Sequence, residues 1–70
     1  MEKNKHQLRR ENRYKEIIRL LKSKKRLSTT KIAGSLGLDV NYLKLLLSDM
    51  KKLDYIIEEK ETNATYWSLR

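Results

Sequence analysis

The chain has 70 residues, a formal net charge of +8 and no cysteine. This length allows one small domain near the lower limit for a stable core, and the composition excludes disulfides, thiolate metal sites and a cysteine nucleophile. No apolar run approaches the roughly 20 residues that cross a bilayer, so we expect a soluble, cytoplasmic protein without a membrane partner.

The positive charge is concentrated towards the N-terminus. Residues 1–26 contain 11 Lys/Arg and three acidic residues, whereas residues 27–70 contain six of each. Such asymmetry indicates a polyanionic partner, either nucleic acid or anionic lipid, although a solubilising tail would have the same composition. Residues 1–11 hold one apolar side chain after Met1, so we predict a basic arm, or a frayed helical extension, ahead of a domain over 12–70.

The first helix is predicted over about 12–25, with Asn12 as its N-cap. Its apolar residues recur at the i, i+3, i+4, i+7 spacing of an amphipathic helix; they are Tyr14, Ile17, Ile18 and Leu21, with Leu20 at the margin. This apolar face is broad for a core of this size. We therefore expect a homodimer that pairs through helix 12–25, with or without the hairpin.

A short second helix is predicted over "TKIAGSLG", after the Ser/Thr cluster "STT", which can cap its N-terminus. Gly37 is placed to end this helix, and Asp39 can cap a third helix over 40–53. The inward-facing residues of the second helix are Ile32, Ala33 and Leu36.

Three consecutive leucines, residues 45–47, lie in the third helix, and its core side has room for only some of them. At 100° per residue, the apolar side consists of Leu43, Leu46, Leu47, Met50 and Leu53. The opposite side consists of Asn41, Leu45, Ser48 and Lys52, with Lys44 and Lys51 flanking it. Leu45 is therefore predicted to be exposed.

The remaining chain is predicted to form a β-hairpin. "YIIEEKE" and "TYWSLR" are rich in β-branched and aromatic residues and are separated by "TNA". Trp67 and Leu69 share one face of the second strand, so we predict that Trp67 belongs to the core rather than to a stacking platform. Glu58, Glu59 and Glu61 lie almost in sequence, which favours a solvated strand surface over a metal site.

The predicted fold is mainly α with a β-hairpin, that is, three helices followed by a two-stranded wing. Two helices joined by a short, Gly-containing turn form a helix-turn-helix, whose second helix fits a DNA major groove. The segment over about 27–69, with "LSTTKIAGSLGLDVNYLKLLLSDMKKLDYI" and a hairpin ending "YWSL", resembles the winged helix-turn-helix fold of small bacterial and archaeal transcriptional regulators.

This resemblance implies that the third helix reads base edges, that the start of the second helix meets a phosphate, and that the hairpin contacts the neighbouring backbone or minor groove. It also implies a dimer. The corresponding DNA-binding positions are Asn41, Tyr42, Lys44, Leu45 and Ser48 on the third helix, Thr29 and Thr30 before it, and Lys60 and Asn63 at the wing tip.

Three departures from the family pattern bear on this expectation. Position 45 is leucine where these regulators often have a polar or basic residue. Asp54 stands where a helix-ending glycine is common, and aspartate tolerates the left-handed conformation. The row of wing glutamates would repel phosphate, so the wing is expected to approach DNA only at its tip, or not at all.

Individual residues suggest particular contacts. Asn41 can pair with adenine, and Lys44 with guanine or a phosphate, although both are also ordinary residues of a solvated helix surface. Tyr42 can reach a phosphate or pack beside the second helix. The basic residues of the N-terminal part would displace counterions from the DNA backbone, and its arginines could also enter a narrow minor groove; these residues are Arg9, Arg10, Arg13 and Lys15.

The favoured function is therefore that of a nucleoid-associated regulator of transcription that binds specific double-stranded DNA sequences. The main alternative is a winged-helix protein-interaction module in which Leu45 docks a partner. A third possible function is that of a non-specific DNA architectural protein or of an RNA-binding protein. Neither an enzyme nor a cofactor is expected, because the chain has no Gly-rich phosphate loop and no Ser/His/Asp set.

Overall fold

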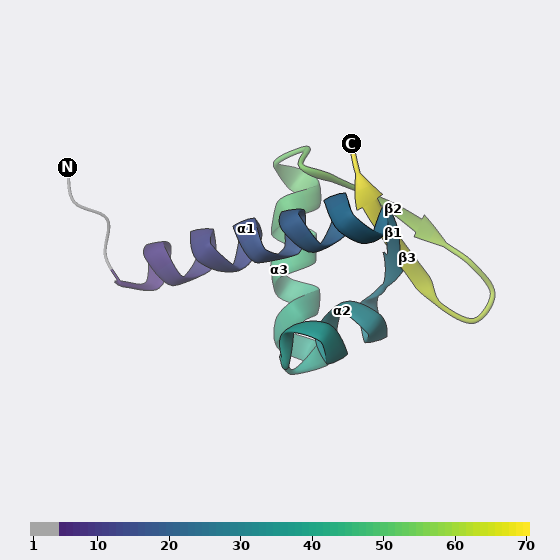
Figure 1. Ribbon diagram of the computed structural model, residues 1–70, viewed down its shortest axis with the longest axis horizontal. Coiled ribbons are helices and arrows are strands. Elements are labelled where there is room, and N and C mark those ends of the chain that lie inside the picture. Colours follow the sequence, from purple (N-terminus) through teal and green to yellow (C-terminus); the bar gives the residue numbers. More distant parts are fainter. Residues whose placement is uncertain (1–4) are drawn as a thin grey trace.

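The computed structural model describes the backbone of residues 5–70 and the side chains of residues 9–70. The predicted helix-rich fold with a β-hairpin is confirmed, but the sheet has three antiparallel strands rather than two. Residues 1–4 of the predicted arm lie outside the described residues. The elements in chain order are α1 (Lys5–Lys24), β1 (Arg26–Ser28), α2 (Thr29–Leu36), α3 (Val40–Lys52), β2 (Ile56–Lys60) and β3 (Thr65–Leu69) (Figure 1).

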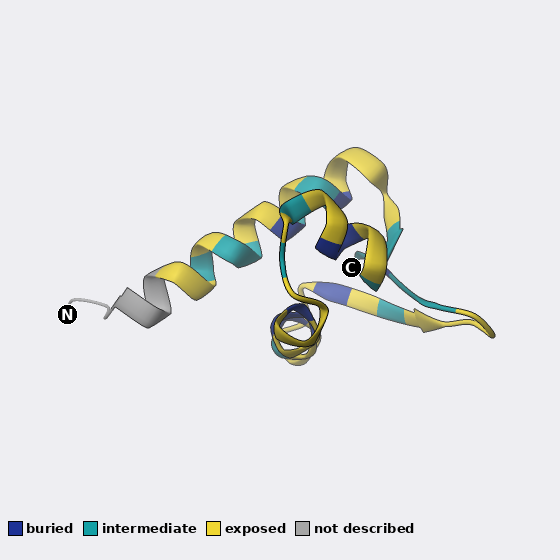
Figure 2. Cartoon of the chain, turned by 90° about the horizontal axis from the view of Figure 1, so that it is seen from below, coloured by how far each residue is buried: buried dark blue, intermediate teal, exposed yellow. Residues whose placement is uncertain are grey.

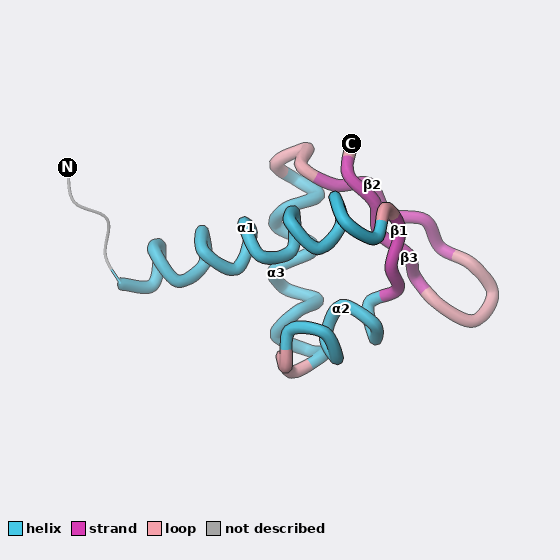
Figure 3. Tube along the Cα trace, in the orientation of Figure 1, coloured by secondary structure: helices cyan, strands magenta, loops and turns pink. Residues whose placement is uncertain are grey.

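β1 is the strand that the sequence did not predict. It pairs with β3, the central strand in the order β1-β3-β2, and Leu27 lies opposite Trp67. Three residues are too few to show the alternation by which a strand is recognised in a sequence. Figure 3 shows the strand between the end of α1 and the start of α2. Leu27 packs against the core, which explains the single apolar residue at this point of the chain.

α1 begins at Lys5 rather than at Asn12 and is 20 residues long. Residues 5–11 contain no proline, glycine or β-branched residue, so their backbone preferences let the helix continue past its apolar face. Asn12 is an interior residue of the helix and not its cap. The helix ends where Lys25 adopts a left-handed conformation with φ 67° and donates its amide to the Leu21 carbonyl at 2.7 Å.

The predicted caps of the helix pair are confirmed. The Ser28 hydroxyl accepts a hydrogen bond from the Lys31 amide at 3.2 Å, at the start of α2. The Asp39 carboxylate accepts from the Tyr42 amide at 3.0 Å, at the start of α3. Gly37 ends α2 in the left-handed conformation, with φ 65°, which an amino acid without a side chain adopts at little cost. These caps fix the short turn between the two helices.

The core lies between the three helices and the inner face of the sheet, as the inward-facing buried segments in Figure 2 indicate. Leu53, predicted for the core side of α3, is instead 53% exposed. The reason is that α3 ends at Lys52 and the chain then turns at Asp54, whose φ is 63°. The buried core residues are Ile17, Leu21, Ile32, Ala33, Leu43, Leu46, Leu47, Met50, Ile56 and Trp67.

The protein is elongated along α1, with extents of 43 × 23 × 20 Å. Figure 2 shows α3 end-on, with α1 on the other side of the core. Each of these two helices therefore turns one side towards the core and the opposite side towards solvent. Within residues 5–70, no helix combines the length and the apolarity that spanning a membrane requires.

Candidate nucleic-acid interface

The exposed side of α3 carries the side chains that the sequence proposed for contact with bases. Leu45 is 68% exposed, whereas Leu46 and Leu47 are buried. The helical period therefore predicted correctly which of the three leucines is exposed. Asn41 and Ser48 are also exposed, and their spacing of four and three residues from Leu45 puts them on the same side of the helix. This side thus presents an amide, an apolar group and a hydroxyl together.

A shallow hollow lies between α3 and the sheet. It brings together three of the predicted DNA-binding residues, one from the start of α2 and two from α3. Lys51 at its edge donates to Glu58 at 2.8 Å, whereas Lys44 forms no ion pair within residues 9–70. Lys44 is therefore available to a phosphate or a base. The residues lining the hollow are Thr29, Lys44, Ser48, Lys51, Glu58, Thr65 and Trp67.

Thr29 has a structural role that the sequence did not predict. The indole N–H of Trp67 donates to its hydroxyl at 2.9 Å, and this hydroxyl donates a long bond of 3.5 Å to the Thr65 carbonyl. Trp67 is only 6% exposed, which confirms its predicted place in the core. Because the Thr29 proton is engaged within the fold, the exposed Thr30 is better able to donate to a phosphate.

A second hollow lies on the other side of α3, where its first turn approaches α1. Its lining residues are Arg9, Asn12, Arg13, Glu16 and Tyr42. The arginines and the tyrosine are predicted DNA-binding residues from distant parts of the chain. Arg13 is paired with Glu16 at 3.0 Å, while Arg9 forms no ion pair with the described side chains. Of the two arginines, Arg9 is the one free to approach a phosphate.

Arg10 connects α1 to α3 through Asp49. Its guanidinium lies 3.5 Å from the Asp49 carboxylate, and Tyr14 lies near the same carboxylate. Partial burial, reinforced by the negative charge of Asp49, raises the pKa of Tyr14 above its ordinary value. The carboxylate beside the exposed side of α3 is therefore neutralised from α1, and its repulsion of a nucleic acid is reduced.

The three glutamates of β2 and the following turn are all ion-paired. Glu58 accepts from Lys51 at 2.8 Å, and Arg26 contacts both Glu59, at 3.4 Å, and Glu61. Arg26 belongs to β1, so sequence reasoning that missed this strand also missed the partner. The repulsion that the sequence predicts between the wing and phosphate is correspondingly weaker.

Arg26 is the centre of a small cluster on the outer face of the sheet. Its guanidinium carbon lies 3.9 Å from the centre of the Tyr66 ring, a distance at which the cation is attracted by the ring face. The hydrogen bond to Glu61 raises the pKa of Arg26. The cluster ties the strand before α2 to both strands of the wing.

At the wing tip, the predicted residues Lys60 and Asn63 lie close together. Both are exposed, and Lys60 has no ion-pair partner among residues 9–70. They line a third hollow, together with Glu61, Thr62, Ala64 and Tyr66.

No protein-family model matches this chain, and a search of curated proteins finds no significantly similar sequence. Function is therefore inferred from the arrangement of the described residues. Their arrangement consists of a helix with an exposed polar and apolar side, flanked by the unpaired cations Arg9 and Lys44 and by a wing whose carboxylates are paired.

Proposed function

We propose that the protein is a winged helix-turn-helix protein that binds specific sequences of double-stranded DNA and regulates transcription, with α3 in the major groove. One observation carries the proposal. The exposed side of α3 presents Asn41, Leu45 and Ser48, while the neighbouring carboxylate of Asp49 is neutralised by Arg10. The major groove admits an α-helix, and this side can enter it with the Asp49 carboxylate already paired to Arg10.

The base contacts that we propose follow from the chemistry of these side chains. Asn41 pairs with an adenine, Lys44 contacts a guanine or a phosphate, and Leu45 packs on a thymine methyl group. Ser48 lies beside Lys44 in the hollow next to the sheet and donates its hydroxyl to a phosphate. Each good base contact contributes about 1–3 kcal/mol of discrimination.

The phosphate contacts that we propose flank α3 on both sides. On one side are Arg9 and Tyr42, which line a common hollow. On the other side are Thr30 at the start of α2 and Lys60 with Asn63 at the wing tip. Contacts of this kind fix the register of the protein on the duplex but do not read its sequence. We assign Arg10 and Thr29 supporting roles, because both have partners within the protein.

Selection from a random pool of DNA duplexes, scored at two salt concentrations, tests the proposal. We expect enrichment of a palindrome, with half-sites about 34 Å apart if two copies bind one duplex. The Asn41→Ala variant should relax the preference at one position of the half-site. Asn12→Ala, the same substitution at an exposed residue of α1, should keep the full preference. Binding without enrichment would instead indicate an architectural protein.

The exposure of Leu45 also favours a second candidate function, a protein-interaction module. A leucine that is 68% exposed and surrounded by polar groups can fill a pocket on a partner protein. The two functions differ in a simple measurement. A protein-interaction module would show no binding to the random pool at low salt, where electrostatic binding to DNA is strongest.

A homodimer, located in the cytoplasm and associated with the nucleoid, is part of the proposal. The apolar side of α1 supports the dimer less than the sequence suggested, because Ile17 and Leu21 are fully buried in the protein's own core. The apolar side chains at the end of α3 and on the edge strand β2 are more exposed than the described ones of α1. We therefore assign the dimer contact to Leu53, Tyr55 and Ile57, which are 44–53% exposed, and sedimentation equilibrium of Ile57→Glu tests this assignment.

A further inference from the structure

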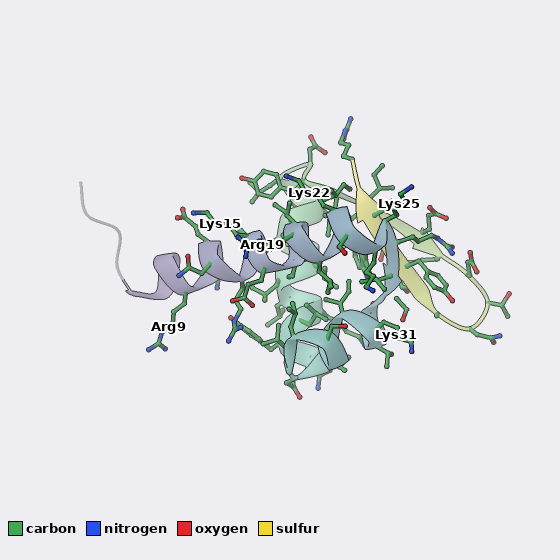
Figure 4. All side chains as sticks on the ribbon, in the orientation of Figure 1. Arg9, Lys15, Arg19, Lys22, Lys25 and Lys31 are labelled. Carbon is green, nitrogen blue, oxygen red and sulfur yellow. The ribbon has the colours of Figure 1, made fainter. Side chains whose placement is uncertain are left out.

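The outer side of α1 carries a row of cations. Lys15, Arg19 and Lys22 follow the i, i+4, i+7 spacing and are exposed, and with Ile18 they line a shallow hollow. None of the three forms an ion pair within residues 9–70. Figure 4 labels their side chains, which project from α1 away from the core. We call these three cations the outer α1 stripe.

The outer α1 stripe lies on the opposite side of the protein from the exposed side of α3. Ile17 and Leu21, fully buried, define the side of α1 that faces the core; Arg19 lies 200° from Ile17 at 100° per residue. On α3, Leu45 likewise lies on the side of the helix that faces away from the core. Figure 2 shows the two helices on either side of the core, and the protein measures only 20–23 Å across its two shorter axes.

Carboxylates near α1 are largely engaged elsewhere. Glu16 pairs with Arg13, and Asp49 pairs with Arg10, both on other sides of the helix. Glu11, four residues before Lys15, has an interaction partner of its own. The outer α1 stripe therefore concentrates positive charge that the protein does not neutralise by itself.

We propose that the outer α1 stripe binds the phosphate backbone of a second DNA duplex, so that one protein holds two duplexes. This inference rests on the proposed function, since it requires that α3 binds the first duplex. The stripe covers about 10 Å of helix at 1.5 Å per residue. One DNA strand carries a phosphate every 3.4 Å or so along the axis, so the three cations can reach phosphates of a single strand.

Two other occupants fit the outer α1 stripe less well. A helix that binds a lipid surface inserts large apolar side chains, but the large exposed apolar side chains of the described residues lie on α3, its end and β2, and not on α1. A second copy docked on the same stripe across a two-fold axis would bring like charges together. A polyanionic backbone offers the complementary charge without either difficulty.

A bridging assay with the full chain tests the inference. One duplex is fixed to beads, and the retention of a second, labelled duplex is measured in the presence of protein. We expect retention to weaken about 40-fold between 50 and 200 mM salt, as three phosphate contacts at 0.9 each would require. The variant Lys15→Ala, Arg19→Ala, Lys22→Ala should lose the retention yet bind a single duplex within about threefold of the wild type.

A charge-matched control is Lys24→Ala, Lys25→Asn, Lys31→Ala, in which asparagine suits the left-handed backbone at position 25. It should retain the second duplex. Alanine favours helix, so circular dichroism should find both variants folded, and glutamine at the stripe positions is a substitute if the alanine variant is not. Each variant removes three positive charges. A difference in retention between them therefore shows that the position of the charges matters and not only their number.

The outcomes distinguish the inference from the proposed function. If the wild type binds a single duplex but never retains a second, the inference is wrong and the proposed function stands. Bridging that survives in the stripe variant but is lost in Leu45→Glu would also overturn it, because two α3 helices of a dimer would then hold the two duplexes. Capture of anionic vesicles in place of a second duplex would identify a lipid surface as the partner. If the wild type binds no DNA at all, both the inference and the proposed function are wrong.

Discussion

The indole N–H of Trp67 in β3 donates a 2.9 Å hydrogen bond to the hydroxyl of Thr29, the first residue of α2. Replacing Thr29 by valine keeps the shape of the side chain but leaves the indole N–H of Trp67, a residue only 6% exposed, without its acceptor. We expect Thr29→Val to lower the free energy of unfolding by about 1–3 kcal/mol, measured by urea denaturation with Trp67 fluorescence. The exposed neighbour provides the control, because Thr30→Val should change stability by less than about 0.5 kcal/mol.

Leu45→Glu should weaken DNA binding by about 10- to 100-fold, because it removes an apolar base contact and brings a carboxylate towards phosphates. Stability should change by less than about 0.5 kcal/mol, since the side chain makes little contact with the core. Ser35→Glu is the control, because it adds the same negative charge at an exposed residue of α2 that has no proposed contact. Equal losses of affinity in the two variants would contradict the assigned role of Leu45.

Arg26→Met should weaken DNA binding several-fold at low salt although Arg26 is not a proposed DNA contact. The change frees Glu59 and Glu61 of the wing, and the two carboxylates would then repel phosphate. The difference from the wild type should shrink as salt screens the repulsion. Arg70→Met removes the same charge from the exposed pair with Asp54 and should have little effect. A salt-independent loss in Arg26→Met would point to a distorted wing instead.

Arg9→Ala should flatten the dependence of log affinity on log salt by about 0.9, the effect of one lost phosphate contact. Sequence preference should be unchanged, because a phosphate contact does not read bases. Lys24→Ala removes an equal charge at the other end of α1 and should leave the slope as it is. If both substitutions flatten the slope equally, the effect reflects net charge and not a contact by Arg9.

Tyr14 predicts a pH dependence of stability. Its pKa is raised above 10.0 by partial burial and by Asp49, so the unfolded chain loses this proton at a lower pH than the folded protein. The contribution of Tyr14 is therefore fully present below about pH 10 and is lost as pH rises through the folded-state pKa. We expect the wild type to lose stability above pH 10 more steeply than Tyr14→Phe. Parallel stability profiles would show that the two states share one pKa.

Local features of the fold were predictable from the sequence because they depend on neighbouring residues. The exposure of Leu45 follows from the helical period, and the caps at Ser28 and Asp39 follow from side chains that bond amides three residues later. The same local reasoning misplaced Leu53, because a period says nothing about where a helix ends. It also misplaced the start of α1, since charged helix formers carry no stop signal.

Features that join distant parts of the chain were not predictable. β1 has only three residues, and its identity as a strand depends on Trp67 lying opposite Leu27. The pairing of Arg26 with the wing glutamates depends in turn on that strand. Likewise, Arg10 was expected to meet DNA, and its contact with Asp49 exists only because α1 continues beyond its apolar face and passes beside α3.

The central place of β3 has a consequence for how the protein acquires its structure. β1 and β2 each pair with β3 and not with one another, and β3 is also the strand that supplies Trp67 to the core. Every other element leaves the ribosome before it. The helices can form early from local contacts, but β1 and β2 have no partner until β3 arrives. The sheet can therefore form only late, and its formation also brings Trp67 to Thr29 at the start of α2.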